Sequence, residues 1–468
     1  MLSADIFMAN DIRGRVDGSA DRPSQWDPAG AHILGATYVD VFGLHGGKFV
    51  LGRDTRTSGL ALATAFMEGA TAAGADVVDV GLVSTDALWF ASGTLQVPGV
   101  MLTASHNPPS DNGIKFCLAG AAPVTPAHLI RLREASMADW SPASEGRARV
   151  ERGDIPMGQI IRREILDDYG AYLRSLVDLT DVGRPRVVVD AGNGMAGLTT
   201  PVVLGPLGLE LIGLYLDLDG TFPNHMPNPL IPENLVAAQQ AVRDQNADVG
   251  LVFDGDADRC FVLDELGEVV SPSVITALIA RALLQEEPGG TVVVNTITSR
   301  AVAENVEAAG GRVVVSKVGH TSVKAHMAEH GAVFGGEHSA HYYFRNFWGA
   351  DTGMLAALHV LALLGGSGGT MSGLAAGVSG YTASGEINST VADPERALAR
   401  VRAAFEAHGV VNLDDGLTIT GSDWWVNARL SNTEPLLRLN VESRDQAEMI
   451  ALRDRALAAI REESAIDD

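Results

Sequence analysis

One local pattern occurs three times along the chain: an apolar strand, a polar loop, a helix and a second apolar strand. The three copies begin at Lys48–Leu51, Arg186–Asp190 and Thr291–Asn295. This order is typical of βαβ units, whose sheets carry helices on both faces. The repetition predicts three similar α/β domains with mixed sheets. Their polar loops follow the carboxyl ends of the strands, where such sheets bind ligands.

The end of the chain has a different pattern. Leu417–Thr420, Trp424–Leu430 and Leu436–Val441 are predicted to be strands joined by short turns, and Gln446–Glu463 to be a helix. Consecutive strands joined in this way pair antiparallel. The predicted fold is therefore α/β, with three similar mixed-sheet domains followed by a C-terminal α+β domain.

Two changes of composition mark predicted domain boundaries. Ser141–Asp154 is rich in charged and small residues, and Gly365–Gly380 is rich in glycine and serine, which favours a hinge. The predicted domains cover residues 1–152, 153–267, 268–378 and 379–468.

The composition argues against several kinds of partner. The chain has 34 basic and 58 acidic residues and a formal net charge of −24, so we expect neither nucleic acid nor an anionic membrane as its partner. No run reaches the roughly 18 apolar residues of a membrane span, and Met354–Leu364 is expected to be a buried helix. Met1–Asp5 lacks the basic start of a secretory signal. Cys117 and Cys260 form no disulfide framework, which favours a cytoplasmic location.

A serine follows one of the apolar strands on a short turn. Val97–Leu102 leads into Thr-Ala-Ser-His-Asn-Pro, and Pro108 and Pro109 then prevent a regular continuation. Ser105 and His106 are therefore expected at the edge of a sheet. Taken alone, such a turn more often serves only to satisfy local backbone groups.

Three aspartates alternate along a second loop, at Asp254, Asp256 and Asp258, between two apolar strands. Three carboxylates on a tight loop repel one another unless they share a cation, and hard oxygen ligands suit Mg²⁺. A calcium-binding EF-hand is excluded because Arg259 stands where that loop needs glycine. A solvated acidic turn is the remaining alternative.

Two further loops carry groups that bind sugars and anions. Gly335–His341 brings together a carboxylate, a hydroxyl and two imidazoles, which suit the hydroxyls of a sugar. Arg429–Pro435, with Arg438 on the next strand, resembles an anion cradle because guanidinium groups donate paired hydrogen bonds to phosphate. Each could also be an ordinary turn in solvent.

Together the four loops resemble, in chain order, the four signature loops of the α-D-phosphohexomutases. Asp11–Gly14 and Gly52–Arg56 match further segments of this superfamily, so the resemblance covers nearly the whole chain and is closest to the bacterial phosphomannomutase/phosphoglucomutase branch. The resemblance implies four domains around a central cleft, each supplying one loop. It also implies an enzyme, an intramolecular phosphotransferase.

The predicted site residues fall into three groups. Those that would hold one Mg²⁺ per chain are Ser105, which is also the phosphorylated residue, Asp254, Asp256 and Asp258. The other predicted catalytic residues are Lys115, Arg13, His106, Arg259 and His320. The predicted substrate-binding residues are Glu337, His338 and Ser339 for the sugar, and Arg429, Ser431, Asn432, Thr433 and Arg438 for the phosphate.

The implied reaction converts a hexose 6-phosphate, of mannose or glucose or both, into the 1-phosphate. It would proceed through a phosphoserine and a hexose 1,6-bisphosphate, which would also act as activator. Phosphoglucosamine mutase and a non-catalytic sugar-phosphate-binding protein are the alternatives. We expect small-molecule hexose phosphates as the partners and a monomer or homodimer as the assembly.

Overall fold

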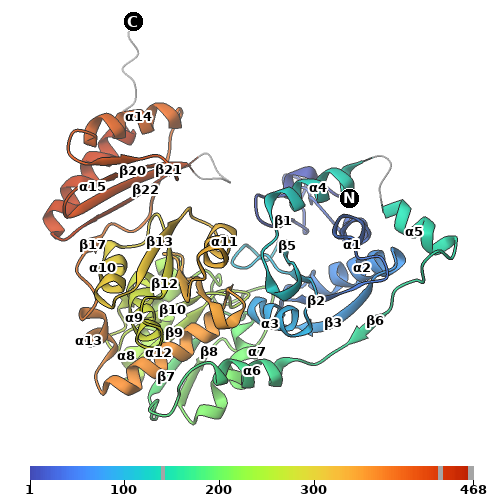
Figure 1. Cartoon of the computed structure of the whole chain (residues 1–468), viewed down its shortest axis with the longest axis horizontal. Coiled ribbons are helices and arrows are strands. Elements are labelled where there is room, and N and C mark those ends of the chain that lie inside the picture. Colours follow the sequence, from blue (N-terminus) through green and yellow to red (C-terminus); the bar gives the residue numbers. More distant parts are fainter. Residues whose placement is uncertain (139–142, 431–435, 462–468) are drawn as a thin grey trace, which may run out of the picture.

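The structure is a computed structural model that describes residues 1–138, 143–430 and 436–461. Its chain forms four sheets in sequence order, one in each domain (Figure 1). The first three domains lie against one another, and the fourth is stacked on the third. The predicted fold, three α/β domains followed by an α+β domain, is confirmed.

The first domain has a sheet in the order β1-β5-β4-β2-β3-β6, in which β5 runs against both of its neighbours. Its strands are β1 (Ile12–Arg15), β2 (Lys48–Arg53), β3 (Asp76–Leu82), β4 (Gly99–Leu102), β5 (Asp111–Cys117) and β6 (Ile160–Arg162). Its helices are α1 (Pro28–Phe42), α2 (Gly59–Ala72), α3 (Thr85–Leu95), α4 (Pro126–Met137) and α5 (Ala143–Glu151). Because side chains alternate along a strand, Phe49 and Leu51 join the core under α1 and α2, whereas Val50 joins the core under α3.

The second domain repeats this plan with the sheet order β11-β10-β9-β7-β8. Its strands are β7 (Arg186–Asp190), β8 (Glu210–Leu214), β9 (Val249–Phe253), β10 (Cys260–Leu263) and β11 (Val269–Val270). Its helices are α6 (Leu166–Ser175), α7 (Ala196–Val203) and α8 (Val236–Gln245). Since β9 and β10 pair antiparallel, the loop with the three aspartates is the turn between them.

The third domain has the sheet order β13-β12-β14-β15-β16. Its strands are β12 (Thr291–Asn295), β13 (Arg312–Ser316), β14 (Phe334–Gly336), β15 (Tyr342–Phe344) and β16 (Ala350–Asp351). Its helices are α9 (Pro272–Glu286), α10 (Arg300–Ala308), α11 (His320–His330), α12 (Gly353–Ser367) and α13 (Met371–Ala376). The predicted sugar-binding loop connects the antiparallel strands β14 and β15.

The fourth domain has an antiparallel sheet in the order β17-β22-β21-β20-β19, with β18 also paired to β22. Its strands are β17 (Thr382–Ala383), β18 (Ile387–Thr390), β19 (Val410–Asn412), β20 (Leu417–Thr420), β21 (Trp424–Leu430) and β22 (Leu436–Ser443). Its helices are α14 (Pro394–Phe405) and α15 (Gln446–Arg461).

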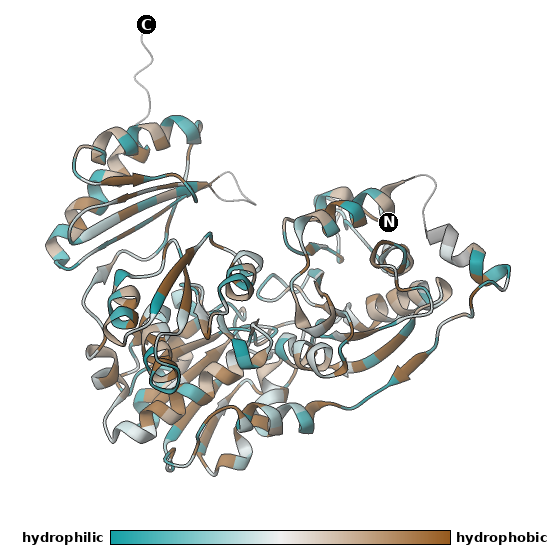
Figure 2. Ribbon diagram, in the orientation of Figure 1, coloured by the Kyte–Doolittle hydropathy of each residue, from teal (hydrophilic) through white to brown (hydrophobic). Residues whose placement is uncertain are grey.

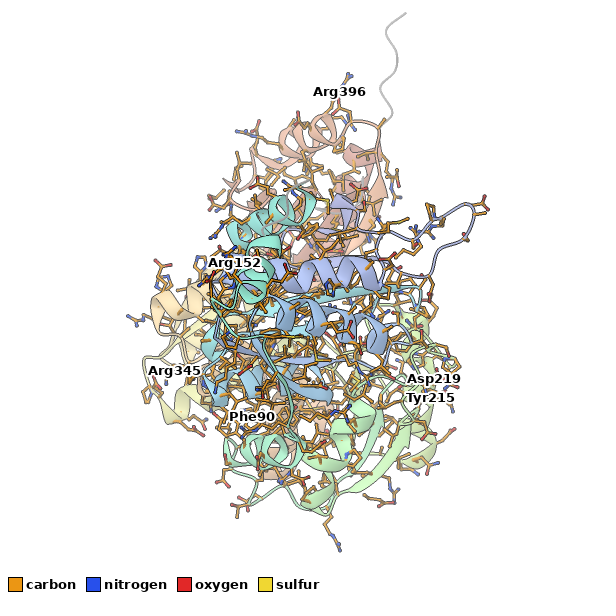
Figure 3. The ribbon with its side chains drawn as sticks, turned by 90° about the vertical axis from the view of Figure 1, so that its right-hand side faces the viewer. Phe90, Arg152, Tyr215, Asp219, Arg345 and Arg396 are labelled. Carbon is orange, nitrogen blue, oxygen red and sulfur yellow. The ribbon has the colours of Figure 1, made fainter. Side chains whose placement is uncertain are left out.

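One continuous hydrophobic core joins the second and third domains to one face of the first, whereas the fourth domain has a core of its own. Figure 2 shows the hydrophobic residues concentrated along the strands. Phe90 of α3, labelled in Figure 3, marks the junction: its ring lies 5.9 Å from Tyr169 of the second domain and 6.3 Å from Trp348 of the third. The first three domains therefore pack as one body, to which the fourth is attached.

Two details differ from the sequence analysis. The segment Gly365–Gly380, expected to be a hinge, is mostly helical, because α12 continues to Ser367 and α13 follows with Met371 buried. The strand β6 pairs with β3, which brings part of the predicted second segment into the first sheet. The division at residues 152, 267 and 378 stays a prediction. In the described part of the chain, none of the helices is long and apolar enough to cross a membrane.

Candidate active site

A cleft of about 650 Å³ lies where the four domains meet. The predicted residues that line it are Arg13, His106, Lys115, Asp258, Arg259, His320, Glu337, Ser339 and Arg438. Loops that are far apart in the sequence thus share one cavity, as expected for loops at the carboxyl ends of strands.

Ser105 lies buried on a strained turn, directly before His106 and Asn107, which line the cleft. Its φ angle of +53° is in the left-handed region, which costs a non-glycine residue about 1 kcal/mol or more. The turn is stabilised by the Ser105 N–H, which donates to Thr103 Oγ1 at 2.9 Å. The Ser105 hydroxyl donates to Asp254 Oδ2 at 2.7 Å, so the turn presents the serine to the aspartate loop.

A buried arginine that the sequence analysis assigned no role holds this turn in place. The two terminal nitrogens of Arg56 donate to four backbone carbonyls at 2.7 to 2.8 Å, those of Ser105, Asn107, Pro108 and Asp111. Its Nε donates to Asp54 at 3.2 Å. In the sequence, Arg56 stands in a charged loop after a strand. Such a pattern does not distinguish an arginine that holds a neighbouring turn from one on a solvated turn.

The three aspartates are all buried, and one oxygen of each lies within 4.8 Å of the others. Gly255 lets their loop approach the serine, because a Cβ at this position would lie 2.4 Å from the Ser105 carbonyl oxygen. Burial, followed by the negative charges of Asp258 and Asp256, raises the pKa of Asp254 well above its ordinary value. A positive charge at this point would relieve the repulsion.

Two observations show that the aspartate loop suits a cation. Among the described residues, Asp256 Oδ1 and Asp258 Oδ1 are buried without a hydrogen-bond partner. Lys115 Nζ already lies 2.6 Å from Asp256 and 2.5 Å from Asp258. Burial works to lower the pKa of Lys115, but these two carboxylates raise it above its ordinary value. The loop is a candidate metal site with a lysine at its edge.

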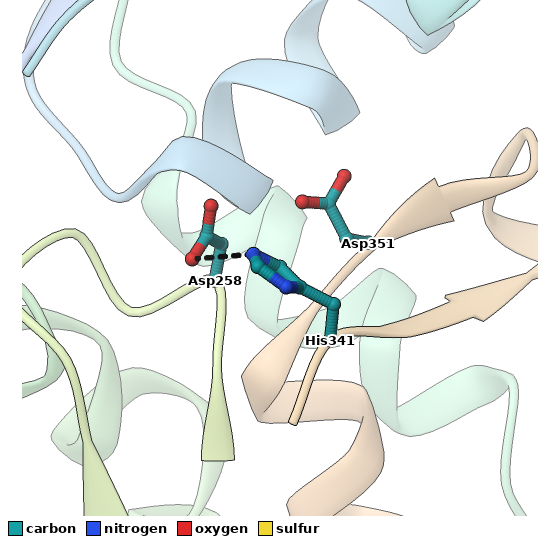
Figure 4. A group of neighbouring side chains, drawn as sticks. All are labelled: Asp258, His341 and Asp351. Atoms are coloured by element: carbon teal, nitrogen blue, oxygen red, sulfur yellow. Dashed lines mark ion pairs between the residues drawn. The ribbon is translucent and has the colours of Figure 1, made fainter. Parts of the chain in front are cut away.

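A second group of possible ligands, Asp258, His341 and Asp351, lies close by (Figure 4). His341 Nε2 is 3.7 Å from Asp258 Oδ1, the ion pair marked in the figure. Asp351 is paired with Lys324, whose Nζ is 2.5 Å away. Lys324 thus supplies a positive charge to one carboxylate of this group.

Arg259 links the aspartate loop to the serine and sugar loops. Its backbone forms a β-bridge with His341, and its Nη2 donates to His106 Nδ1 at 3.1 Å. Burial and then the charge of Arg259 lower the pKa of His106 well below its ordinary value, so the imidazole is neutral at physiological pH. His341 was absent from the predicted site, although it stands on the predicted sugar loop and its Nδ1 lies 2.9 Å from Ser339 Oγ.

Glu337 is held by three hydrogen-bond donors on the wall of the cleft. Its Oε1 accepts from Asn295 Nδ2 and from the Gly319 N–H, both at 3.1 Å, and its Oε2 accepts from the Tyr343 hydroxyl at 2.6 Å. A carboxylate held in this way has one fixed orientation, while its remaining lone pairs can still accept from a ligand. Asn295 and Tyr343 were not predicted as part of the site.

His320 of the third domain and Arg13 of the first domain both line the cleft. His320 begins α11, and burial followed by the charge of Lys324 lowers its pKa to about 4. Arg13 donates to Asp11 at 2.8 Å and to Asn107 Oδ1 at 3.2 Å, which places its guanidinium beside the serine turn.

The remaining predicted residues belong to the fourth domain or its border. Arg429 and Arg438 are both paired with Glu386. His338 lines a separate cavity of about 350 Å³ between the third and fourth domains instead of the main cleft. The predicted phosphate-binding residues Ser431, Asn432 and Thr433 lie outside the described residues.

Family models cover almost the entire chain. Domains I, II and III of phosphoglucomutase/phosphomannomutase, each described as alpha/beta/alpha, match residues 4–139, 167–267 and 271–381, and the C-terminal domain matches 386–459. The chain belongs to the phosphoglucomutase/phosphomannomutase family. The predicted superfamily and enzyme class, a phosphohexomutase, are thereby confirmed.

Relatives within this family match over their full lengths. A phosphomannomutase of Escherichia coli is 36% identical over 475 residues, covering 99% of this chain and 100% of the relative. A phosphomannomutase/phosphoglucomutase of Pseudomonas aeruginosa is 33% identical, covering 96% and 94%. The crystal structure of a phosphoglucomutase/phosphomannomutase family protein from Burkholderia thailandensis superimposes with a TM-score of 0.85 at 31% identity, covering 99% of both chains.

Proposed function

We propose that this enzyme interconverts the 6-phosphates and 1-phosphates of mannose and glucose through a phosphate carried on Ser105. The observation that carries the proposal is the buried Ser105 hydroxyl, 2.7 Å from Asp254, on a turn whose next residue, His106, lines a cleft to which all four domains contribute. A hexose 1,6-bisphosphate is the intermediate and, in trace amounts, the activator that keeps Ser105 phosphorylated.

The proposed metal ligands are Ser105, through its phosphate, and the three aspartates, Asp254, Asp256 and Asp258. One Mg²⁺ bound there would supply the charge that offsets the phosphoserine and the carboxylates. The unpartnered oxygens of Asp256 and Asp258 support this assignment. Phosphoryl transfer depends mainly on positioning and charge stabilisation, and both come from this loop.

The chain's own cations act on the same phosphate. Lys115, Arg259 and Arg13 line the cleft around Ser105 and would stabilise the phosphoryl group as its bond to the serine oxygen breaks and its bond to the sugar hydroxyl forms. The hydroxyl proton must pass to a base. His320, whose lowered pKa keeps it neutral, is the group we propose for this role.

Substrate choice follows from the loop of Glu337 and Ser339, which we propose to contact the 3- and 4-hydroxyls of the sugar. These hydroxyls have the same orientation in mannose and glucose, which differ at C2. His338, the other residue of this loop predicted to bind the sugar, lines the neighbouring cavity instead of the cleft. A site without a dedicated bond to C2 discriminates weakly. We therefore expect both sugars to react.

The fourth domain would hold the phosphate that does not react, through Arg429 and Arg438 and, by the family resemblance, Ser431, Asn432 and Thr433. Its separate core supports motion against the other three domains. Such motion would let the bisphosphate turn over inside the cleft, so that its second phosphate returns to Ser105.

Location and assembly are also proposals. Cys117 and Cys260 are both buried and neither forms a disulfide, which fits a reducing cytoplasm. A monomer or homodimer remains our expectation for the assembly. The alternatives, a phosphoglucosamine mutase and a non-catalytic binding protein, are not favoured by the comparisons.

One assay tests the proposed function. The purified enzyme is given mannose 1-phosphate, glucose 1-phosphate or glucosamine 1-phosphate with Mg²⁺ and a trace of glucose 1,6-bisphosphate, and formation of the 6-phosphate is followed. We expect the first two to react with kcat/KM values within roughly a hundredfold of each other. Turnover of glucosamine 1-phosphate alone, or release of free phosphate instead of 6-phosphate, would contradict the proposal.

A further inference from the structure

Two arginines face each other across the hairpin of the fourth domain. β21 and β22 pair antiparallel with Arg429 directly opposite Arg438, so both side chains lie on one face of the sheet. Like charges directly opposite one another in a ladder repel. An anion between the two guanidinium groups removes this repulsion.

Glu386 supplies that anion. Its Oε2 accepts a hydrogen bond from Arg429 Nη2 at 2.8 Å, and its Oε1 accepts one from Arg438 Nη1 at 3.1 Å. Each carboxylate oxygen thus serves one guanidinium group. The oxygens of a phosphate bind paired arginines in the same way.

The backbone holds Glu386 in this position. It follows Gly385, whose φ of +67° makes the turn between β17 and β18, and both of these strands pair with β22. The turn is fixed by the Val441 N–H, which donates to Ser384 Oγ at 2.9 Å. The Glu386 carboxylate is therefore presented to the arginines by a short, paired segment.

Burial strengthens the contact. The Arg429 side chain is 10% exposed and that of Glu386 is 26% exposed, so the pair is only partly screened by water. Arg438 also lines the cleft, which places this group of charges at the edge of the cavity. Charges at such a site interact more strongly than a pair on the open surface.

We propose that Glu386 competes with the substrate's phosphate for Arg429 and Arg438, and so limits how tightly the phosphate is held. The inference rests on the proposed function, in which these arginines bind the phosphate that does not react. With Glu386 in place, its carboxylate offsets part of the positive charge that a phosphate dianion meets at the two arginines. A moderate affinity suits a mutase, because the bisphosphate must leave this position in each turnover to present its other phosphate.

The competing explanation is that Glu386 only orients the arginines. The two explanations predict opposite results when the charge of Glu386 is removed. Competition predicts tighter phosphate binding, whereas orientation predicts weaker binding, since the guanidinium groups would lose the partner that holds them.

The test is calorimetric binding of inorganic phosphate to the native protein, to Glu386→Gln and to Glu406→Gln. Glu406 is the matched control, because it pairs with Arg402 on the surface at the end of α14, at 2.8 Å, and its replacement removes the same charge from the same domain. We expect Glu386→Gln to bind phosphate about tenfold more tightly, as for the loss of one partly screened charge, and Glu406→Gln to match the native protein. Unchanged or weaker binding by Glu386→Gln would overturn the inference.

A further variant, Arg438→Ala, separates this inference from the proposed function. If it binds phosphate as tightly as the native protein, the phosphate site lies elsewhere, and both the site assignment and the competition are overturned. If it binds phosphate weakly while Glu386→Gln shows no gain, only the competition is overturned. Steady-state kinetics also test the competition. Competition predicts that Glu386→Gln has a lower KM for glucose 1-phosphate, and a lower kcat because the bisphosphate leaves the arginines more slowly.

Discussion

Arg56 donates a hydrogen bond of 2.8 Å to the backbone carbonyl oxygen of Ser105, which lies 49 residues further along the chain. The arginine is itself buried and paired with Asp54. The position of the proposed nucleophile therefore depends on a guanidinium group from a different loop of the same domain.

We predict that Arg56→Lys lowers kcat by roughly one hundredfold while KM changes little. A lysine keeps the charge but cannot bond four carbonyls at once, so the serine turn loses its fixed geometry. Steady-state kinetics with glucose 1-phosphate measure the effect. Arg53→Lys, at the end of β2 and outside the cleft, is the control and should keep native turnover. A native kcat in Arg56→Lys would show that the four hydrogen bonds to these carbonyls are dispensable.

The Tyr343 hydroxyl is predicted to orient Glu337 for the sugar. Tyr343→Phe removes the donor at Glu337 Oε2 and should lower kcat/KM about fivefold for mannose and glucose phosphates alike, the typical effect of one hydrogen bond. Tyr342→Phe is a matched control on the same strand, since among the described residues the Tyr342 hydroxyl has no hydrogen-bond partner. Equal kinetics in the two variants would argue against the role of Tyr343.

Removal of the metal is expected to abolish activity. EDTA should stop turnover and added Mg²⁺ should restore it. Asp256→Asn should raise the Mg²⁺ concentration for half-maximal activity at least tenfold, because one charged ligand is lost. Asp244→Asn on the exposed end of α8 removes the same charge and should leave the requirement unchanged. Full activity in EDTA would show that the aspartates have a purely structural role.

Stability is predicted to fall in mild acid, partly through His359 of α12. Its ring is buried and stacked at 5.0 Å on Phe344, and burial lowers its pKa to about 4. Between pH 6.5 and 4 this histidine binds a proton in the unfolded chain but not in the folded protein. The group therefore lowers the free energy of unfolding by about 2 kcal/mol by pH 5. His320, with its pKa also lowered to about 4, acts in the same direction.

The measurement is Tm at pH 7.5 and pH 5.0. His359→Leu should reduce the drop in Tm between the two, because the leucine has no proton to take up. His408→Leu, at an exposed position after α14, should leave the drop as in the native protein. An unchanged drop in His359→Leu would mean that this histidine is protonated in the folded state.

The strands were the most predictable part of the fold. β7 and β12 were predicted with their observed bounds, as were β20 and β21, because each is a short apolar or alternating run between turn residues. The polar loops predicted to form the site lie at the ends of β4, β9, β14 and β21, which are apolar or alternating runs of the same kind. The hydrophobic pattern of each strand and the direction of the chain are enough to place such loops at the carboxyl edge of a sheet.

The parts that sequence reasoning missed depend on contacts between distant segments. The bonds from Arg56 to the serine turn and from Glu386 to Arg429 and Arg438 join residues tens of positions apart, and nothing in the local pattern of either residue indicates a partner. α13 was missed because glycine and serine usually favour loops, whereas packing of Met371 stabilises a helix there.

The central claim is that Ser105 carries the phosphoryl group that is transferred. Phosphopeptide mapping by mass spectrometry, after incubation with glucose 1,6-bisphosphate and Mg²⁺, tests it most directly. The account predicts one phosphate on Ser105, and it predicts that this phosphate is exchanged for the substrate's phosphate when glucose 1-phosphate with a labelled phosphate is added. It also predicts no phosphate and almost no turnover in Ser105→Ala, whereas the neighbouring control Ser110→Ala behaves as the native enzyme. A phosphate on any other residue, or near-native turnover in Ser105→Ala, would contradict it.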